Sequence, residues 1–287
     1  MDGLAELAWS EFGIRPTTRL PVTESFSSSV MSFIGADGRH YVLKQHWARN
    51  KAEREVAALR ALATHPMVPA LLGVSDRDGT LTLLIEGLAG TTWVDDSLVT
   101  PGFLHELGRA MAHMHLVSAD SFDGLASWHE LLQGNAERYI TSIGSEDRPL
   151  AERGLEVLLG HLVDVPASDD PRLVHFDLRP GNILGHQGHL TGIIDFESCR
   201  GGHPSMDVFK LWQQVPQHLA QVLDGYRDVA GATAAWAELD TSTTLMHVYA
   251  AYHGLAGLAW CHTRGDFSGA FPTVNRSLIT QALDLLT

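Results

Sequence analysis

Residues 174–184 read Val-His-Phe-Asp-Leu-Arg-Pro-Gly-Asn-Ile-Leu, residues 193–197 read Ile-Ile-Asp-Phe-Glu, and these two segments decide the fold. Two carboxylates and one carboxamide, from Asp177, Asn182 and Asp195, stand in them among apolar residues. Apolar pairs and runs of this length, broken by polar loops, are typical of short strands. The polar side chains are therefore expected at the ends of strands.

The strands and the turn can be placed individually. One strand enters the first segment at 173–174, one leaves it at 183–184, and a third covers 190–194 after a turn at Gln187-Gly188. A surface hairpin with polar tips is the plain alternative. It does not explain why six residues stand in register, namely His175, Asp177, Pro180, Gly181, Asn182 and Asp195.

These residue types are those that phosphoryl transfer requires. One acid meets the attacking hydroxyl, and an amide oxygen with a second acid holds magnesium against nucleotide phosphates. In the kinase signature the base and the amide are five residues apart, and the metal-binding Asp follows the next strand. Asp177, Asn182 and Asp195 have that order and that interval.

The two segments resemble the catalytic and metal-binding loops of the aminoglycoside phosphotransferase family, which includes choline, homoserine and fructosamine kinases and is distantly related to protein kinases. The resemblance implies a bilobal protein-kinase-like fold of the α+β class. A small β-rich N-terminal lobe with one helix would cover residues 1–90, and a larger helical lobe residues 91–287. The implied cofactors are ATP, with GTP as the alternative nucleotide, and Mg²⁺.

The resemblance also implies residue roles within the catalytic loop (173–184) and the metal segment (193–197). Asp177 would be the catalytic base that orients the substrate hydroxyl, and Asn182 and Asp195 would hold magnesium. Arg179 would place a cation near the transferred phosphoryl group. His175 would tie the loop to the metal segment.

Two departures and one supporting residue complete this region. Phe176 stands where the family commonly has Gly, so the loop is expected to sit differently. Asp195-Phe196-Glu197 replaces the Asp-Phe-Gly of protein kinases, which argues against a flipping regulatory loop. In the family, an Asp at the place of Asp207 supports the catalytic loop through its backbone, and we assign Asp207 this structural role.

The first 90 residues predict a nucleotide-binding lobe. A bend containing Ser27, Ser28 and Ser29 lies between two strands, and its amides and hydroxyls could hold phosphate. Lys44 ends the following strand, at the position of the kinase strand lysine. A helix is predicted from 50 to 63, and Glu55 borders its apolar face, so we expect Glu55 to pair with Lys44.

Two further strands are expected between residues 68 and 90. The second, at 81–85, resembles the strand that leads into the family's hinge between the lobes. The resemblance implies that the Ile85 carbonyl and the Gly87 amide bond the adenine edge, with Leu84 behind it. Backbone groups do not depend on residue type, so position alone carries this prediction.

The second part of the chain predicts a helical lobe with the substrate cleft. Helical spacing is found at 102–117, 125–143, 150–164, 208–215, 216–230, 233–239, 241–263 and 274–286. Tyr249, His253 and Trp260 fall roughly on one helix face, where they would line the cleft or pack the core, the commoner outcome. The candidate acids for a cationic substrate are Glu197, Glu238, Asp240 and Asp266, of which Glu197 is favoured because the metal site fixes it near the reaction.

Charge and composition limit the classes of partner that the protein could bind. The net charge of −14 is uneven, because residues 1–90 carry −1 and residues 91–287 carry −13. Nucleic acid is a poor partner for such a surface. The excess acid either attracts a cationic substrate or only keeps the protein in solution. Without a membrane span or a leader, and with two cysteines, Cys199 and Cys261, expected to be reduced, a cytoplasmic protein with no obligate protein partner is predicted.

Taken together, the sequence predicts an ATP-dependent phosphotransferase acting on a hydroxyl of a small cationic molecule, most simply an aminoglycoside or another basic antibiotic. The alternatives are a metabolic kinase for choline, homoserine or a sugar amine, and a nucleotide-binding scaffold without turnover. Protein kinase activity fits less well, because only 11 residues separate Asp195 from Asp207 and leave no room for a peptide-docking loop.

Overall fold

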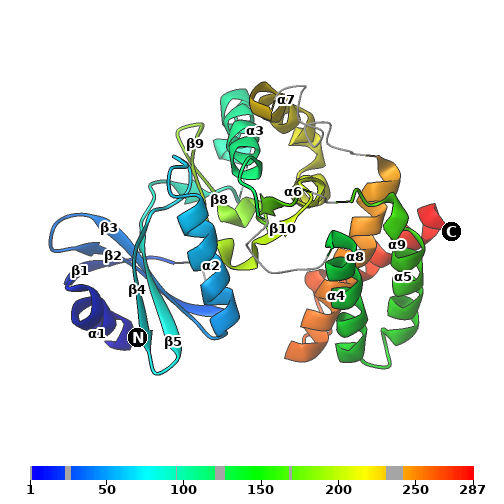
Figure 1. Cartoon of the computed structure of the whole chain (residues 1–287), viewed down its shortest axis with the longest axis horizontal. Coiled ribbons are helices and arrows are strands. Elements are labelled where there is room, and N and C mark those ends of the chain that lie inside the picture. The colour runs from blue at the N-terminus through cyan, green and yellow to red at the C-terminus, as the bar shows by residue number, and fades with distance from the viewer. Residues whose placement is uncertain (1, 23–26, 95, 120–126, 168–169, 231–241) are drawn as a thin grey trace.

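The structure is a computed structural model that describes residues 2–22, 27–94, 96–119, 127–167, 170–230 and 242–287. A β-rich region that holds the N-terminus lies beside a helical region that holds the C-terminus (Figure 1). This arrangement confirms the predicted two-lobed α+β fold.

A five-stranded antiparallel sheet forms the first lobe. Its strands are β1 (Pro16–Leu20), β2 (Ser28–Gly35), β3 (His40–His46), β4 (Leu71–Arg77) and β5 (Thr80–Glu86), hydrogen-bonded in the order β1-β2-β3-β5-β4. The turn between β4 and β5 holds Asp78 and Gly79 at φ +52° and +81°, the left-handed conformation of two-residue hairpin turns. The short turn places β4 at the edge of the sheet, and β5 lies between β4 and β3.

The first lobe contains two helices, whereas one was predicted. Helix α2 (Arg49–Ala61) is the predicted one, and it buries Val56, Leu59 and Glu55. Helix α1 (Asp2–Phe12) is additional, and Leu4, Leu7 and Ala8 pack against the aromatic side of the sheet. Spacings of three and four residues between such side chains are the sequence signal for this helix.

The second lobe is mainly helical. Its helices are α3 (Pro101–His115), α4 (Trp128–Ser142), α5 (Arg148–Gly160), α6 (Ser205–Gln214), α7 (Leu219–Ala230), α8 (Thr243–Arg264) and α9 (Ala270–Leu286). A three-stranded antiparallel sheet has the order β6 (Thr91–Thr92), β8 (Ile183–His186) and β9 (His189–Ile193), and β7 (Arg172–Val174) pairs with β10 (Arg200–Gly202). The turn predicted at Gln187-Gly188 joins β8 and β9. The predicted helix at 233–239 lies outside the described residues.

Local chemistry sets several helix ends. The Thr100 hydroxyl accepts the Phe103 amide hydrogen at 3.0 Å, and Pro101 follows at the first helical position, so α3 begins there. Gly265 ends α8 at φ +70°, where a glycine costs least. These caps fix the length of the helices that frame the site.

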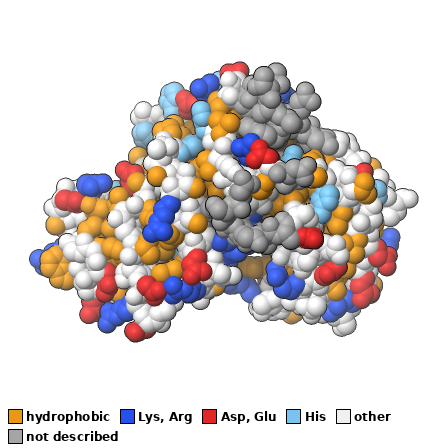
Figure 2. All heavy atoms as spheres, viewed as in Figure 1, with side chains coloured by type: hydrophobic (Ala, Val, Ile, Leu, Met, Phe, Trp, Pro, Cys, Tyr) orange, Lys and Arg blue, Asp and Glu red, His pale blue; other side chains and the backbone are white. Residues whose placement is uncertain are grey.

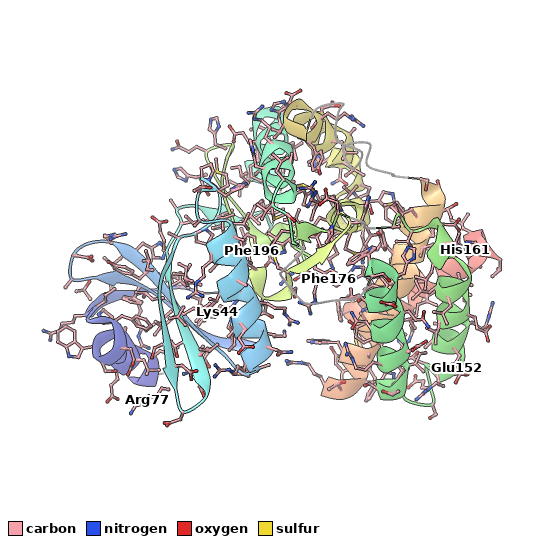
Figure 3. All side chains as sticks on the ribbon, in the orientation of Figure 1. Lys44, Arg77, Glu152, His161, Phe176 and Phe196 are labelled. Atoms are coloured by element: carbon pink, nitrogen blue, oxygen red, sulfur yellow. The ribbon has the colours of Figure 1, made fainter. Side chains whose placement is uncertain are left out.

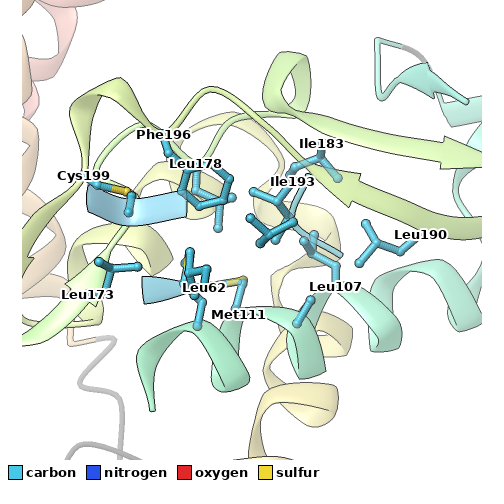
Figure 4. Packing of buried hydrophobic residues seen from close by; sticks show 14 of the residues in the cluster. Leu62, Leu107, Met111, Leu173, Leu178, Ile183, Leu190, Ile193, Phe196 and Cys199 are labelled. Carbon is cyan, nitrogen blue, oxygen red and sulfur yellow. The ribbon is translucent and has the colours of Figure 1, made fainter. Parts of the chain in front are cut away.

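One apolar core joins the lobes. Leu62 lies beyond the end of α2, Leu107 and Met111 come from α3, and Leu178 and Phe196 come from the two segments quoted at the outset (Figure 4). Because these residues are almost fully buried, the catalytic and metal segments rest on both lobes. Among the described residues, no helix is both long and apolar enough to cross a membrane.

Candidate active site

Asp207 holds the backbone of the catalytic loop. It lies in the first turn of α6 and is fully buried. Its carboxylate accepts the amide hydrogens of His175 at 2.7 Å and Phe176 at 2.8 Å, and it also contacts His115 Nε2 at 3.0 Å. A buried carboxylate is stable only with such partners. The predicted structural role of Asp207 is confirmed.

His175 links the loop to the metal segment, as predicted. Its Nε2 lies 2.9 Å from the Ile194 carbonyl oxygen, and its ring packs against Phe196 with centroids 4.8 Å apart. An imidazole N–H can donate to that carbonyl. The contact fixes the distance between the strand before Asp195 and the loop before Asp177.

Phe176 adopts a backbone conformation that favours glycine, with φ +68°. Its ring lies among aromatic neighbours: Trp128 at 6.0 Å, Tyr252 at 6.1 Å and His253 at 6.0 Å between centroids. Ring packing therefore offsets the backbone strain.

The carboxylate of Asp177 is flanked by two cations. Lys210 Nζ lies 3.3 Å from Oδ1, and Arg179 Nε lies 3.1 Å from Oδ2. Burial raises the pKa of Asp177, but Lys210 and Arg179 lower it more, so the net pKa is below the usual value. Asp177 is thus ionised at neutral pH and can accept a hydrogen bond from a hydroxyl.

Asn182 and Asp195 present oxygens that could hold a metal. The Asn182 amide nitrogen donates to the Asp177 carbonyl oxygen at 2.9 Å, which leaves the side-chain carbonyl as an acceptor. Asp195 has a left-handed backbone, φ +72°, and its side chain is 32% exposed. Within the described ranges, no group of three His, Cys, Asp or Glu residues could hold a metal alone. This donor set suits Mg²⁺, which takes one or two protein oxygens and completes its shell with phosphates and water.

Lys44 and Glu55 form the predicted ion pair. Lys44 Nζ lies 3.0 Å from Glu55 Oε2, and it also contacts Asp195 and Glu197. Lys44 projects from β3 towards α2 (Figure 3). Burial lowers the pKa of Lys44, but Glu55, Asp195 and Glu197 together raise it above its usual value, so the ammonium stays charged. Glu53 faces solvent, where it pairs with Arg49, as expected from its position on the helix.

Glu197 does not have the predicted role of a substrate-binding acid. It is 6% exposed, and its Oε1 lies 2.7 Å from Lys51 Nζ. Its Oε2 accepts from Ser27 Oγ at 2.7 Å and lies 3.4 Å from Lys44 Nζ. Burial raises the pKa of Glu197, but His46, Lys44 and Lys51 bring it well below its usual value. With its oxygens committed to the first lobe, Glu197 has no capacity left for a substrate cation.

His46 and Lys51 were not singled out from the sequence. His46 Nε2 lies 2.6 Å from Glu55 Oε2, and Nδ1 lies 3.3 Å from Glu197 Oε2. Burial lowers the pKa of His46, but the two carboxylates raise it above 6.5 overall. His46 has the same strand parity as Lys44, and Lys51 precedes Glu55 by one helical turn. These spacings are the signal that could have identified both.

The serine bend is shorter than predicted. Ser28 and Ser29 already belong to β2, where they pair with His46 and Gln45. Ser27 is a bend residue, and its hydroxyl donates to Glu197. Only Ser27 of the three therefore lies in a non-strand segment, beside residues 23–26, which are outside the described part.

The hinge prediction needs a correction of one residue. The Gly87 amide donates to the His40 carbonyl oxygen at 3.0 Å, and Ile85 pairs with Val42 and Leu71 inside the sheet. Gly87 therefore has no amide hydrogen left for adenine. The backbone groups of successive residues in an extended strand point to opposite sides of the strand. Those of Glu86 therefore point away from the side to which the Gly87 amide points.

His253 packs beside the loop that carries Asp177. Its ring stacks on Phe209 with centroids 5.0 Å apart and contacts Phe176, the neighbour of Asp177. Burial and the nearby Lys210 lower the pKa of His253 well below 6.5, so the ring is neutral. Tyr249 on the same helix is core, as expected, because its hydroxyl bonds Ser205 at 3.0 Å.

Trp260 and Asp266 are not brought to the same place. Trp260 packs against Phe271 of α9 with centroids 5.3 Å apart, and lies about 10 Å along the helix from His253. Asp266 follows Gly265, beyond the end of α8. Glu238 and Asp240 lie outside the described residues. None of the four proposed acids is thus placed beside Asp177 by the described structure.

Lys210 is the main functional candidate that the sequence did not reveal. It stands three residues after Asp207 on α6, so the two side chains share one face of the helix. A site with one ionised carboxylate, two adjacent cations and two metal-ligand oxygens can orient a hydroxyl and neutralise a polyanion. That combination is what phosphoryl transfer demands.

Comparisons with known proteins agree with this geometry. No curated protein sequence matches the chain. The fold is similar to an aminoglycoside phosphotransferase, APH(4)-Ia, solved with AMP-PNP and hygromycin B (TM-score 0.77, 17% identity, 98% of each chain covered). It is also similar to a putative fructosamine-3-kinase from Thermobifida fusca (0.70, 21%, 99% of each) and to the macrolide 2'-phosphotransferase MphH from Brachybacterium faecium (0.67, 18%, 99% of each).

A sequence profile of the APH phosphotransferase enzyme family matches residues 19–241. The match covers more than half of the chain and includes both quoted segments. The chain belongs to this family of phosphotransferases, which act on hydroxyl groups of small molecules.

Proposed function

We propose that this protein transfers the γ-phosphoryl group of ATP, with Mg²⁺, to a hydroxyl of a small basic molecule, and that an aminoglycoside or another basic antibiotic is the acceptor. The observation that carries the proposal is the meeting of Asp177, Asn182 and Asp195 beside the buried Lys44–Glu55 pair. A pseudokinase scaffold would not need all of these groups intact.

In this proposal the side chains divide the work. Asp177 accepts a hydrogen bond from the acceptor hydroxyl and orients it in line with the phosphorus. Asn182 and Asp195 would hold Mg²⁺, which when bound neutralises phosphate charge. Lys44, positioned by Glu55, leaves its contact with Asp195 to meet the nucleotide phosphates. Positioning and charge neutralisation supply most of the rate.

The adenine would meet the segment after β5. The Glu86 amide bonds the Ala70 carbonyl oxygen on the β4 side at 2.9 Å, and the Gly87 amide bonds His40 on the β3 side. Alternation then directs the Glu86 carbonyl and the Leu88 amide to the side where β4 begins. We propose these two groups as the adenine partners, in place of Ile85 and Gly87. GTP, which lacks the adenine amino donor, should bind more weakly.

The basic acceptor rests on charge and on fold relatives. The second part of the chain holds almost the whole excess of acid. In Figure 2, however, red acidic side chains are spread among blue basic ones on the visible face, which fits ordinary solubility charge as well. The relative solved with hygromycin B and another solved with spectinomycin favour antibiotics. The putative fructosamine-3-kinase favours a sugar amine as the second candidate.

An ADP-release assay with a compound panel tests the proposal. The panel holds aminoglycosides, spectinomycin, macrolides, basic peptide antibiotics, choline, homoserine and fructosamine, each with Mg-ATP. We expect turnover with at least one antibiotic, abolished by chelating Mg²⁺. Turnover only with fructosamine or choline would favour a metabolic kinase. Tight ATP binding without turnover on any compound would favour a scaffold.

A further inference from the structure

Lysine is used sparingly in this chain. Among 20 Lys and Arg residues, lysine occurs only at positions 44, 51 and 210. All three contact a carboxylate of the candidate site: Lys44 meets Glu55, Lys51 meets Glu197, and Lys210 meets Asp177. The other basic residues are arginines, of which Arg179 also contacts Asp177. An ammonium is a compact charge with three rotatable donors, and Lys44 uses it to contact three carboxylates.

Lys210 is held beside the catalytic carboxylate by α6. The same helix positions the loop through Asp207, which bonds two loop amides. Lys210 follows three residues later, and its side chain is 12% exposed. Its ammonium lies 3.3 Å from Asp177 Oδ1. One helix therefore fixes both the backbone of the loop and a cation at its functional oxygen.

Asp177 and the two cations that contact it carry a net positive charge. Asp177 carries one negative charge, but Lys210 and Arg179 together bring two positive charges to its oxygens. A carboxylate that only oriented a hydroxyl would need neither cation. The excess of one positive charge suits a transferred phosphoryl group, whose equatorial oxygens carry the charge of the transition state.

The two cations differ in how deeply their side chains are buried. The Lys210 side chain is 12% exposed and that of Arg179 is 46% exposed. Water screens an exposed cation, whereas a shielded one acts at low effective dielectric. Lys210 is thus the stronger candidate, although Arg179 stands two residues after the base, at the position of the protein-kinase lysine.

We propose that Lys210 is a catalytic residue whose ammonium binds a non-bridging oxygen of the γ-phosphoryl group during transfer while keeping its contact with Asp177. This inference rests on the proposed function. In the step, the acceptor oxygen bonds to phosphorus, the bond from phosphorus to the β–γ bridging oxygen breaks, and ADP keeps that electron pair. The hydroxyl proton passes to Asp177 and then to water.

A purely structural role would predict different behaviour. If Lys210 only anchored α6, its loss would lower stability and leave the chemistry of the folded enzyme intact. Since Asp207 already attaches α6 to the loop, we expect Lys210→Met to fold. Its melting temperature should be checked before any kinetic comparison.

The test compares Lys210→Met, Lys210→Arg and Arg179→Met with wild type. We expect Lys210→Met to lower kcat by about 10² to 10³-fold, as for other transition-state donors, with the KM for ATP within threefold. Lys210→Arg should recover part of the loss, and Arg179→Met should lose less than tenfold. Arg227→Met, at an exposed ion pair on α7, is the control with unchanged activity. A kcat within threefold of wild type for Lys210→Met would overturn the proposal.

A binding measurement separates this inference from the proposed function. Calorimetry compares ADP with Mg²⁺ alone and with aluminium fluoride, which mimics the planar phosphoryl group. Wild type should bind the fluoride complex more tightly, and Lys210→Met should lose most of that preference. Equal preference in both proteins would overturn the role of Lys210, even if no acceptor is found. Absence of turnover by wild type would count against the proposed function alone.

Discussion

At the scale of single residues, Phe176 shows how side-chain packing compensates for an unfavourable backbone conformation. The loop requires φ +68° at this position, which costs a non-glycine residue about 1–2 kcal/mol. Contacts of the ring with Trp128, Tyr252 and His253 offset this energetic cost. The sequence suggested that the loop would sit differently from that of the family, which stays a prediction.

Replacing Phe176 by alanine or by glycine separates the effect of the ring from that of the backbone strain. Phe176→Ala loses the ring and keeps the strain, while Phe176→Gly loses the ring and relieves the strain. We expect both to be less stable than wild type, with Gly more stable than Ala by about 1 kcal/mol. Urea unfolding of the three proteins measures this. At an ordinary position Ala is the more stable, so that order here would disprove the strain.

The predicted site residues that the structure brings together share one property: their environment follows from the chain nearby. Asp177, Asn182 and Asp195 are framed by their own strands, and Glu55 by its helix. Glu197 was misassigned because its partners come from β3, α2 and the bend at Ser27, more than 140 residues away. Spacing along the chain contains no information on such contacts.

At the scale of elements, α6 is the support of the catalytic loop. Asp207→Ala would leave the buried amides of His175 and Phe176 without acceptors and His115 without its carboxylate. Each unpaired group costs about 1–3 kcal/mol. We expect a loss of about 3–5 kcal/mol in the free energy of unfolding, together with most of the activity.

The matched control is Asp224→Ala on α7. Asp224 is exposed and pairs with Arg227 within its own helix, so its loss should change stability by less than about 1 kcal/mol. Chemical unfolding of both variants tests the difference. Equal effects would mean that α6 does not support the loop through Asp207.

The hinge shows that identifying a strand does not reveal which of its backbone amides are free. Strand β5 was expected at nearly its observed bounds, yet the Gly87 amide, one of the expected adenine partners, is already bonded to the His40 carbonyl oxygen. A shift of one residue along a strand reverses the direction of its amides. Only the neighbours β3 and β4 reveal which amides are already paired. Helix α1 was missed for a simpler reason, since its apolar spacing is short.

At the scale of the whole molecule, Glu197 and His46 join the lobes across the nucleotide site. The pKa of His46 is raised, so its stabilisation is complete below 6.5 and is lost as pH rises through the higher folded pKa. The pKa of Glu197 is lowered, so its stabilisation is complete above 4.5 and is lost as pH falls towards the lower folded pKa. The connection between the lobes is therefore strongest between about pH 4.5 and 6.5.

Unfolding experiments at several pH values test this connection. The stability difference between wild type and His46→Gln should be largest below pH 6.5 and shrink as pH rises. The difference for Glu197→Gln should instead shrink under acid conditions. His189→Gln, at an exposed ring on β9, is the control and should change little at any pH. A His46 difference that grows with pH would contradict the assignment.

The central claim is that Asp177 serves transfer of a phosphoryl group from ATP to a small-molecule hydroxyl. The most direct measurement is phosphorylated product formed with Mg-ATP and the best panel acceptor, for wild type and Asp177→Asn. The account predicts product from wild type and a loss of at least about 10³-fold in kcat for Asp177→Asn, with ATP binding retained. Equal rates for the two proteins would contradict it.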